Sequence, residues 1–369
     1  MEVQRISADS LRQFMTQVFL RLGYSVDQAS DAANVLLWAS LRSIDTHGVR
    51  NLKNYYVDRT LSGLLQPAAQ IRIEHETPQS ARLDGNSGLG LVTACHAMRL
   101  AIHKATESGV GLVAVRNTHH LGPAGYFANM AAQAGMLGMC MTGHFFGRGH
   151  HIGVAPMESV VPMFSTNPFS FAAPCGKHPP FVLDMSSSIT TVNRIQMHGQ
   201  AGMPIPAGWA RDAEGNATTD PLAARVLSPL GGTAEHGGYK GLGLAMMVSI
   251  LSGVLSRSWA PIAEALTDPG DPGLSPSSSV YNQPTMGHFF FAVRIDLFQS
   301  LDDFRQSMDA MIDALHATPV VSPNAKVSYP GEPEAQIAAE RLRDGIPIAT
   351  RLHNELTEMA QWFGIDPPR

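Results

Sequence analysis

The chain is poor in cysteine, in long apolar runs and in surplus positive charge. Its 369 residues include three cysteines, Cys95, Cys140 and Cys175, an odd and scattered set. Such a set forms neither a disulfide framework nor a CxxC metal site, so we expect buried free thiols in a reducing cytoplasm. No stretch approaches the ~20 apolar residues that span a bilayer, and a formal net charge of −5 does not attract phosphate backbones. We expect no membrane and no nucleic acid among its partners.

The start of the chain carries helical signals. Residues 7–22 place apolar side chains at helical spacing, and Gly23 ends this helix. Ser25 and Gln28 form a capping box for a second helix that runs through Leu41. Both helices precede any strand pattern, so we expect an all-helical N-terminal unit.

The middle of the chain alternates between strand and helix patterns, without the regular order of a doubly wound sheet. The most apolar stretch, 241–255, predicts a buried helix. Residues 198–230 predict a long ordered loop, and residues 267–282, rich in Pro, Gly and Ser, predict a mobile surface loop. The other patterns predict strands at 70–75, 110–115, 136–142, 169–173, 181–185 and 288–295, and helices at 90–108, 125–134, 301–316 and 332–343.

Two glycine-rich segments raise the question of a bound dinucleotide. The first, Gly88-Leu89-Gly90, lacks the third glycine of a Rossmann fingerprint and the acidic strand end expected about 20 residues later. We interpret it as a tight turn into a helix. The second, residues 237–244, lacks the Walker spacing but opens a helix, where amide donors and Lys240 could hold a pyrophosphate.

Two histidine turns carry the strongest catalytic signal. His47 lies in a polar turn beside Thr46, and His119 and His120 directly follow the strand at 110–115. Site residues in α/β proteins gather at strand ends. Imidazole suits proton transfer to a carbonyl oxygen because its pKa lies near neutrality. The alternative for any single histidine is an ordinary hydrogen-bonded loop residue, whereas two such turns favour a catalytic role.

Metal-ligand spacing is missing from the sequence. The chain has no HExxH motif and no Cys/His cluster. Adjacent histidines such as His150 and His151 rarely chelate one ion. We therefore expect a site without metal.

Seven longer motifs follow one another along most of the chain. They are IDTHGVRNLKNY, VRNTHHLGPAGYFANMAAQAGMLG, STNPFSFAAP, FVLDMSSS, MPIPAGWARDAEGNATTDP, GGYKGLGLAMMVSILSGVLS and SYPGEPE. Together, and in this order, they resemble the type-2 malate/L-lactate dehydrogenase family. This family includes ureidoglycolate, sulfolactate and diketogulonate dehydrogenases and a cyclic-imine reductase.

The resemblance implies an α+β fold. One domain, residues 76–299, would contain a mixed sheet that binds NAD or NADP without a Rossmann loop. The other would be helical and built from both chain ends, residues 1–75 with 300–369. The resemblance also implies a homodimer.

The resemblance further assigns roles to single residues. His47 and His120 become the acid/base candidates, and we expect Thr46 to orient the proton donor. The residues that would contact the cofactor are His120, Leu121, Gly122, His144, Thr166, Asn167, Pro168, Asp184, Met185, Ser186, Ser187, Arg194, Tyr239, Lys240, Gly331 and Glu332.

Two positions depart from the family pattern. The family turn has arginine four residues after its histidine, where this chain has Asn51, and Arg50 comes one place earlier. The imine-reducing branch has aspartate at the position of Arg194, and a cation there favours an anionic hydroxy acid. The carboxylate of such a substrate needs a cationic partner, for which the planar arginine fork is suited. The candidates are Arg50, ranked first, with Asn51 beside it, then Arg148 and Arg194.

These observations predict an NAD- or NADP-dependent oxidoreductase that moves hydride between nicotinamide and a small 2-hydroxy or 2-oxo acid of the malate or lactate kind. One alternative is an NADPH-dependent reductase of a cyclic imine, piperideine- or pyrroline-2-carboxylate. Another is an inactive paralogue that binds a metabolite. The intact His47, His120 and Lys240 argue against the inactive paralogue.

Overall fold

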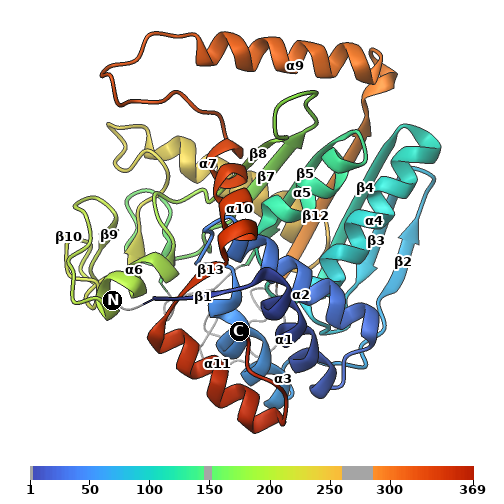
Figure 1. Cartoon of the computed structure of the whole chain (residues 1–369). Helices are drawn as coiled ribbons and strands as arrows, with labels where there is room; N and C mark the ends of the chain where they lie inside the picture. Colours follow the sequence, from blue (N-terminus) through green and yellow to red (C-terminus); the bar gives the residue numbers. More distant parts are fainter. Residues whose placement is uncertain (1–2, 145–151, 260–285) are drawn as a thin grey trace, which may run out of the picture.

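A seven-stranded mixed sheet forms the centre of the protein (Figure 1). The structure, a computed structural model, describes residues 3–144, 152–259 and 286–369. The predicted surface loop at 267–282, Arg148 and the pair His150–His151 lie outside the described residues. In spatial order the strands are β2 (Arg72–Glu76), β3 (Ser80–Asp84), β4 (Val110–Thr118), β12 (Met286–Arg294), β5 (Met136–Gly143), β7 (Phe169–Ala173) and β8 (Phe181–Met185).

The direction of the strands separates this sheet from a doubly wound one. Strands β3 and β4 are parallel and joined by α4 (Gly90–Ser108), whereas the five other neighbouring pairs of the described sheet are antiparallel. Helix α4 begins directly after the glycine-rich turn 85–89, which confirms the interpretation of that segment as a turn into a helix. The predicted mixed, non-Rossmann sheet is therefore present.

Helices cover both faces of the sheet. Because side chains alternate along a strand, Val113 and Val115 of β4 join a cluster with α4 and α5 (Ala124–Gln133), while Ala114 points the other way. Ala114 packs in a second cluster with Val248 of α7 (Gly238–Ser249). Strand β4, held between these two clusters, ends at Thr118, so its position determines where His119 and His120 lie.

Both chain ends build one layer beside the sheet. It contains α1 (Ala8–Arg21), α2 (Val26–Leu41), α10 (Glu332–Asp344) and α11 (Thr350–Phe363). The predicted capping box of Ser25 and Gln28 starts α2, and the side chain of Ser7 caps α1. One hydrophobic cluster runs from Leu11 of α1 to Phe290 of β12, so the helical layer and the sheet share a core.

The prediction of an all-helical N-terminal unit is wrong. Strand β1 (Val3–Ile6) precedes α1 and pairs antiparallel with β13 (Ile346–Ala349), so that Ile6 lies opposite Ile346. Four residues carry no clear strand period, and their partner lies far away in sequence. A local pattern could not reveal this pair.

A smaller sheet occupies the segment predicted as a long loop. Its strand order is β10 (Ala217–Thr218), β9 (Ala210–Arg211), β11 (Val226–Leu227) and β6 (Gly153–Val154). The segment 198–230 is ordered as predicted, but it contains three of these two-residue strands and begins inside α6 (Val192–Gln200). The remaining elements are the turns Val49–Asn51, Leu52–Val57, Ile250–Val254 and Ile295–Leu297, with α3 (Asp58–Leu61) and α9 (Leu301–His316).

The apolar stretch 241–255 is not fully buried, contrary to the prediction. It forms α7 and a π-helical turn, Ile250–Val254, whose inner side packs on the sheet. A row of side chains on its outer side is exposed: Met246 49%, Met247 37%, Ile250 54%, Val254 57% and Leu255 54%. Hydropathy alone does not distinguish a helix buried all round from one with an uncovered apolar face. No helix in the described part of the chain has the length and apolarity needed to cross a membrane.

Candidate functional site

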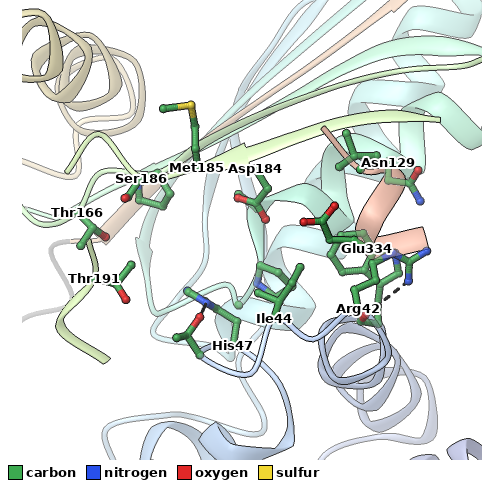
Figure 2. Close-up of a pocket in the computed structure, with 18 of the residues that line it drawn as sticks. Arg42, Ile44, His47, Asn129, Thr166, Asp184, Met185, Ser186, Thr191 and Glu334 are labelled. Carbon is green, nitrogen blue, oxygen red and sulfur yellow. Dashed lines mark hydrogen bonds between the residues drawn. The ribbon is translucent and has the colours of Figure 1, made fainter. Parts of the chain in front are cut away.

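A cavity of about 440 Å³ lies where several distant parts of the chain meet (Figure 2). They include the end of α2 with the turn that follows it, the turn after β4 with the start of α5, the segment before β7, the end of β8 with the segment after it, and the start of α10. Ten residues from the sequence prediction line it: Thr46, His47, Gly122, Thr166, Pro168, Asp184, Met185, Ser186, Arg194 and Gly331.

His47 lies on the wall of this cavity. The carbonyl oxygen of Thr46 accepts hydrogen bonds from the side-chain amides of Asn51 and Asn193, which hold the turn in place. The Thr46 hydroxyl lies 2.8 Å from His47 Nδ1. Burial lowers the pKa of His47 to about 4, because the surrounding protein disfavours the charged imidazole. His47 is therefore neutral at pH 7.

His120 stacks on His47, although the cavity itself touches only His47. Their ring centres are 5.4 Å apart and their planes differ by 17°. Nδ1 of His120 faces the hydroxyl of Tyr56 at 3.0 Å and the backbone N–H of Gly122 at 3.2 Å. Burial, followed by the nearby charges of His47, Arg59 and His288, holds the pKa of His120 well below its ordinary value. The two histidine turns singled out in the sequence thus lie against each other as a stacked pair.

A third histidine, His288, forms a hydrogen bond to the turn that carries His119 and His120. His288, on β12, is 0% exposed. Its Nε2 lies 3.2 Å from the carbonyl oxygen of His119, and its Nδ1 lies 2.8 Å from the hydroxyl of Thr142. A carbonyl only accepts, so Nε2–H donates to the His119 oxygen, and a neutral ring carries no second proton on Nδ1. Burial lowers the pKa of His288 to about 3, in keeping with this neutral form.

Asp184 is the last but one residue of β8 and lines the cavity. Its Oδ2 accepts the N–H of Gly125 at 2.8 Å, at the start of α5. A side chain on residue 125 would meet that carboxylate within 2.9 Å, so the close approach requires glycine. Burial raises the pKa of Asp184 to about 6, the Gly125 hydrogen bond opposes this shift, and the charge of Glu334 adds to it. The carboxylate is thus mostly ionised at pH 7 and can accept hydrogen bonds from the hydroxyl groups of a ligand.

A half-buried arginine marks one side of the cavity. Arg42 caps α2, and its guanidinium carbon lies 4.2 Å from the centre of the Trp38 ring. Burial lowers the pKa of Arg42 to about 10, so it stays charged. Within the described residues no carboxylate reaches ion-pair distance of it, although Glu334 and Asn129 lie on the same side of the cavity (Figure 2). Sequence reasoning missed these residues, because the inner face of a helix near a site looks the same as a core face.

The other predicted residues lie away from this cavity. Arg50 donates a hydrogen bond to Gln200. Asn51 is buried, and its side-chain amide donates to the Thr46 carbonyl oxygen within the turn. Leu121, Asn167 and Ser187 are buried, with the Asn167 amide bonded to α7. Tyr239 and Lys240 are exposed on the first turn of α7, Glu332 bonds to His316, and the His144 carbonyl accepts from Ser165. The predicted role of Arg148 falls on a residue outside the described ranges.

Metal ligands do not converge here. In residues 3–144, 152–259 and 286–369, no group of three His, Cys, Asp or Glu side chains could hold an ion. All three cysteines are free thiols; Cys95 and Cys140 are buried, as predicted, and Cys175 is partly exposed.

Comparison with known proteins gives a consistent result over nearly the whole chain. A sequence model of the malate/L-lactate dehydrogenase family matches residues 6–357. A malate dehydrogenase from Pyrococcus horikoshii is 35% identical over 367 residues, 98% of this chain and 96% of the relative. A malate/(S)-sulfolactate dehydrogenase from Methanothermus fervidus is 29% identical, with 98% of both chains covered.

The fold agrees with these relatives. The crystal structure of a malate dehydrogenase from Entamoeba histolytica superposes with a TM-score of 0.88 at 28% identity, and the match covers 100% of both chains. These three relatives are hydroxy acid dehydrogenases, so this chain is an oxidoreductase of the same class that uses a nicotinamide cofactor. It belongs to the malate/L-lactate dehydrogenase family.

Proposed function

We propose that the protein interconverts a small 2-hydroxy acid and its 2-oxo acid, with NAD or NADP, at the cavity beside His47. One observation carries the proposal: His47, one of a pair of stacked, neutral imidazoles, lines a cavity that also holds an ionised carboxylate and an arginine with no ion partner among the described residues. Acid/base groups and charged groups for ligand binding are thus gathered in one place. Malate and sulfolactate, the substrates named for the relatives, are both hydroxy acids with a second anionic group.

The side chains at this cavity fit a dinucleotide. The buried hydroxyl of Thr190 and the buried indole N–H of Trp38, both on lining residues, have no hydrogen-bond partner within the described chain. Asp184 can accept ribose hydroxyls, and Arg42 can neutralise phosphate charge. A ligand rich in hydroxyl and phosphate oxygens would satisfy all four groups. When bound, nicotinamide supplies or accepts the hydride, and the protein handles the proton.

The substrate carboxylate needs a cation, and the geometry favours Arg194 over Arg50. Arg194 lies in the first turn of α6, lines the cavity and stacks over the Trp209 ring at 5.2 Å. Arg50 is held by Gln200 instead. We therefore propose Arg194 as the carboxylate partner. Its charge also favours a carboxylate substrate over a neutral group.

A substrate screen tests the function. The protein is mixed with NADH or NADPH and with pyruvate, oxaloacetate, sulfopyruvate, 2-oxoglutarate or a cyclic imine carboxylate, and the loss of reduced nicotinamide is followed by absorbance. We expect turnover with at least one 2-oxo acid. Turnover of the imine alone would identify an imine reductase. Binding of neither reduced cofactor, measured by its fluorescence, would contradict the proposal outright.

We further propose that the chain forms a homodimer and works in the cytoplasm. The free thiols suit a reducing compartment. The exposed outer row of α7 and its π-helical turn has the i, i+4 spacing of a packing face. Such a continuous apolar row is typical of a protein–protein interface. We propose that a second copy of the chain packs against this row.

Replacing Ile250 by glutamate should convert the dimer to a monomer. Ile250 is 54% exposed in the middle of the row, and a charge buried at an interface costs several kcal/mol when it is unpaired. Sedimentation velocity at micromolar concentration measures the mass. The control is Leu222→Glu, which changes an even more exposed leucine outside the row, 78% exposed, and should leave the dimer intact. A monomeric parent protein, or two dimeric variants, would exclude this interface.

A further inference from the structure

The hydroxyl of Tyr56 is buried directly against one nitrogen of His120. Tyr56 is 1% exposed and lies on the π-helical turn Leu52–Val57, two residues before the start of α3. Its hydroxyl is 3.0 Å from His120 Nδ1. Neither the sequence motifs nor the cavity lining singles this tyrosine out, yet it touches the histidine pair.

The neighbours of His120 Nδ1 determine which nitrogen carries the proton. The backbone N–H of Gly122, at 3.2 Å, can only donate, so Nδ1 must accept. The Tyr56 hydroxyl keeps its proton, because burial raises the pKa of Tyr56 above its ordinary value, and so it donates to the same nitrogen. A neutral His120 then carries its single proton on Nε2.

His47 differs in the partner of its own Nδ1. That partner is the Thr46 hydroxyl, at 2.8 Å, and a hydroxyl can both donate and accept. His47 can therefore change its protonation state without breaking this hydrogen bond. His120 cannot, because a proton on its Nδ1 would face the N–H of Gly122.

We propose that Tyr56 is a positioning residue, which together with the Gly122 N–H keeps His120 as a neutral hydrogen-bond donor through Nε2. His120 is partly exposed and stacked on His47, just behind the cavity wall. From there its Nε2–H polarises the carbonyl of a substrate bound beside His47, and His47 alone gives and takes the proton. This inference rests on the proposed function. In the oxidation, neutral His47 takes the hydroxyl proton of the 2-hydroxy acid, the O–H bonding pair becomes the π pair of the carbonyl, and the hydride on the carbon would leave to the oxidised nicotinamide. His47 ends protonated and then releases that proton to solvent, and His120 keeps its Nε2 proton throughout.

Glutamine replacements separate the two roles. A glutamine side chain presents an N–H donor near the position of Nε2 but cannot take up a proton near neutral pH. We expect His120→Gln to keep the turnover number within roughly tenfold of the parent enzyme, while His120→Ala loses ~10²–10³-fold. His47→Gln should be as inactive as His47→Ala. A His120→Gln enzyme as inactive as His120→Ala, beside an active His47→Gln enzyme, would overturn the assignment.

The role of Tyr56 has its own readout, independent of activity. In protein labelled with ¹⁵N-histidine and free of ligands, we expect the His120 Nδ1 signal to be that of an unprotonated nitrogen, with assignment by loss of the signal in His120→Gln. A protonated Nδ1 would refute the proposal, whatever substrate the enzyme takes.

A matched pair of tyrosine variants tests the kinetic consequence. Tyr56→Phe should lower the turnover number by roughly tenfold and shift the His120 Nδ1 signal, since one of two donors is lost. Tyr24→Phe is the control, because Tyr24 is also buried, 4% exposed, and bonds Thr60 rather than His120. Equal effects of the two variants on turnover and on the ¹⁵N signal would assign Tyr56 a merely structural role.

Discussion

An alanine in place of His47 should lower the turnover number of the enzyme by ~10²–10⁴-fold, the range expected when a positioned acid/base group is lost. His47 is the histidine on the cavity wall, and Thr46 holds its Nδ1 in either protonation state. The cofactor dissociation constant should change little, because His47 moves a proton at the substrate oxygen during the chemical step, and dinucleotide binding requires no such proton transfer. Steady-state kinetics and fluorescence titration of reduced nicotinamide give the two numbers.

The control for this experiment is His75→Ala. His75 is an exposed histidine on the edge strand β2, far from the cavity lining. Its loss should leave both turnover and cofactor binding at parent values. A folded His47→Ala enzyme with near-parent turnover would show that His47 is not the acid/base group, and His120 would then be the remaining candidate.

Acid should weaken the fold through its buried histidines. The pKa is lowered by burial to about 4 in His47 and in His119, and to about 3 in His288. The unfolded chain titrates near 6.5, so between that value and the folded pKa the unfolded state binds more protons. Stability contributed by these residues is therefore complete above pH 6.5 and declines as pH falls toward 4. From pH 7 to pH 5, a fully buried histidine of this kind contributes a loss of about 2 kcal/mol.

His288 is the residue on which to measure this effect. In His288→Gln the amide can keep a hydrogen bond to the His119 carbonyl but cannot titrate, so the difference in unfolding free energy between pH 7 and pH 5 should shrink by about 2 kcal/mol. Urea unfolding at both pH values provides the data. His103→Gln, at an exposed position on α4, should leave the difference unchanged. Asp184 titrates with the opposite sign, since its pKa is raised to about 6, but it cancels when variant and parent are compared.

Local signals explain which parts of the fold could be predicted. Helices α1 and α2 begin at side-chain caps that the sequence displays, and β7 and β8 are short apolar runs bounded by turns. The pair β1–β13 and the strand β3 were missed, because their pairing partners, not their own residues, make them strands. The exposed row on α7 was misjudged for a related reason: burial depends on what packs against a helix.

The candidate site divides along the same line. Motif residues at strand ends, such as Asp184 at the end of β8, were predicted to contact the cofactor and do line the cavity. Arg42 and Tyr56 were not predicted as site residues. The spacing of a helix residue near a site does not differ from that of an ordinary core or surface residue. Arg50 was ranked first from its place in the turn, but the choice of hydrogen-bond partner, here Gln200, is decided by tertiary structure.

The pairing of the two chain ends also constrains how the protein is made in the cell. Strand β1 leaves the ribosome before its partner β13, which lies about 340 residues later. At translation rates of roughly 5–20 residues per second, the first strand waits about 20–70 seconds for that partner. During this time α1, which carries the buried side chains Leu11 and Phe14, lacks its contacts with α11. Nascent chains of this protein should therefore be clients of chaperones that bind near the ribosomal exit, until synthesis has passed β13.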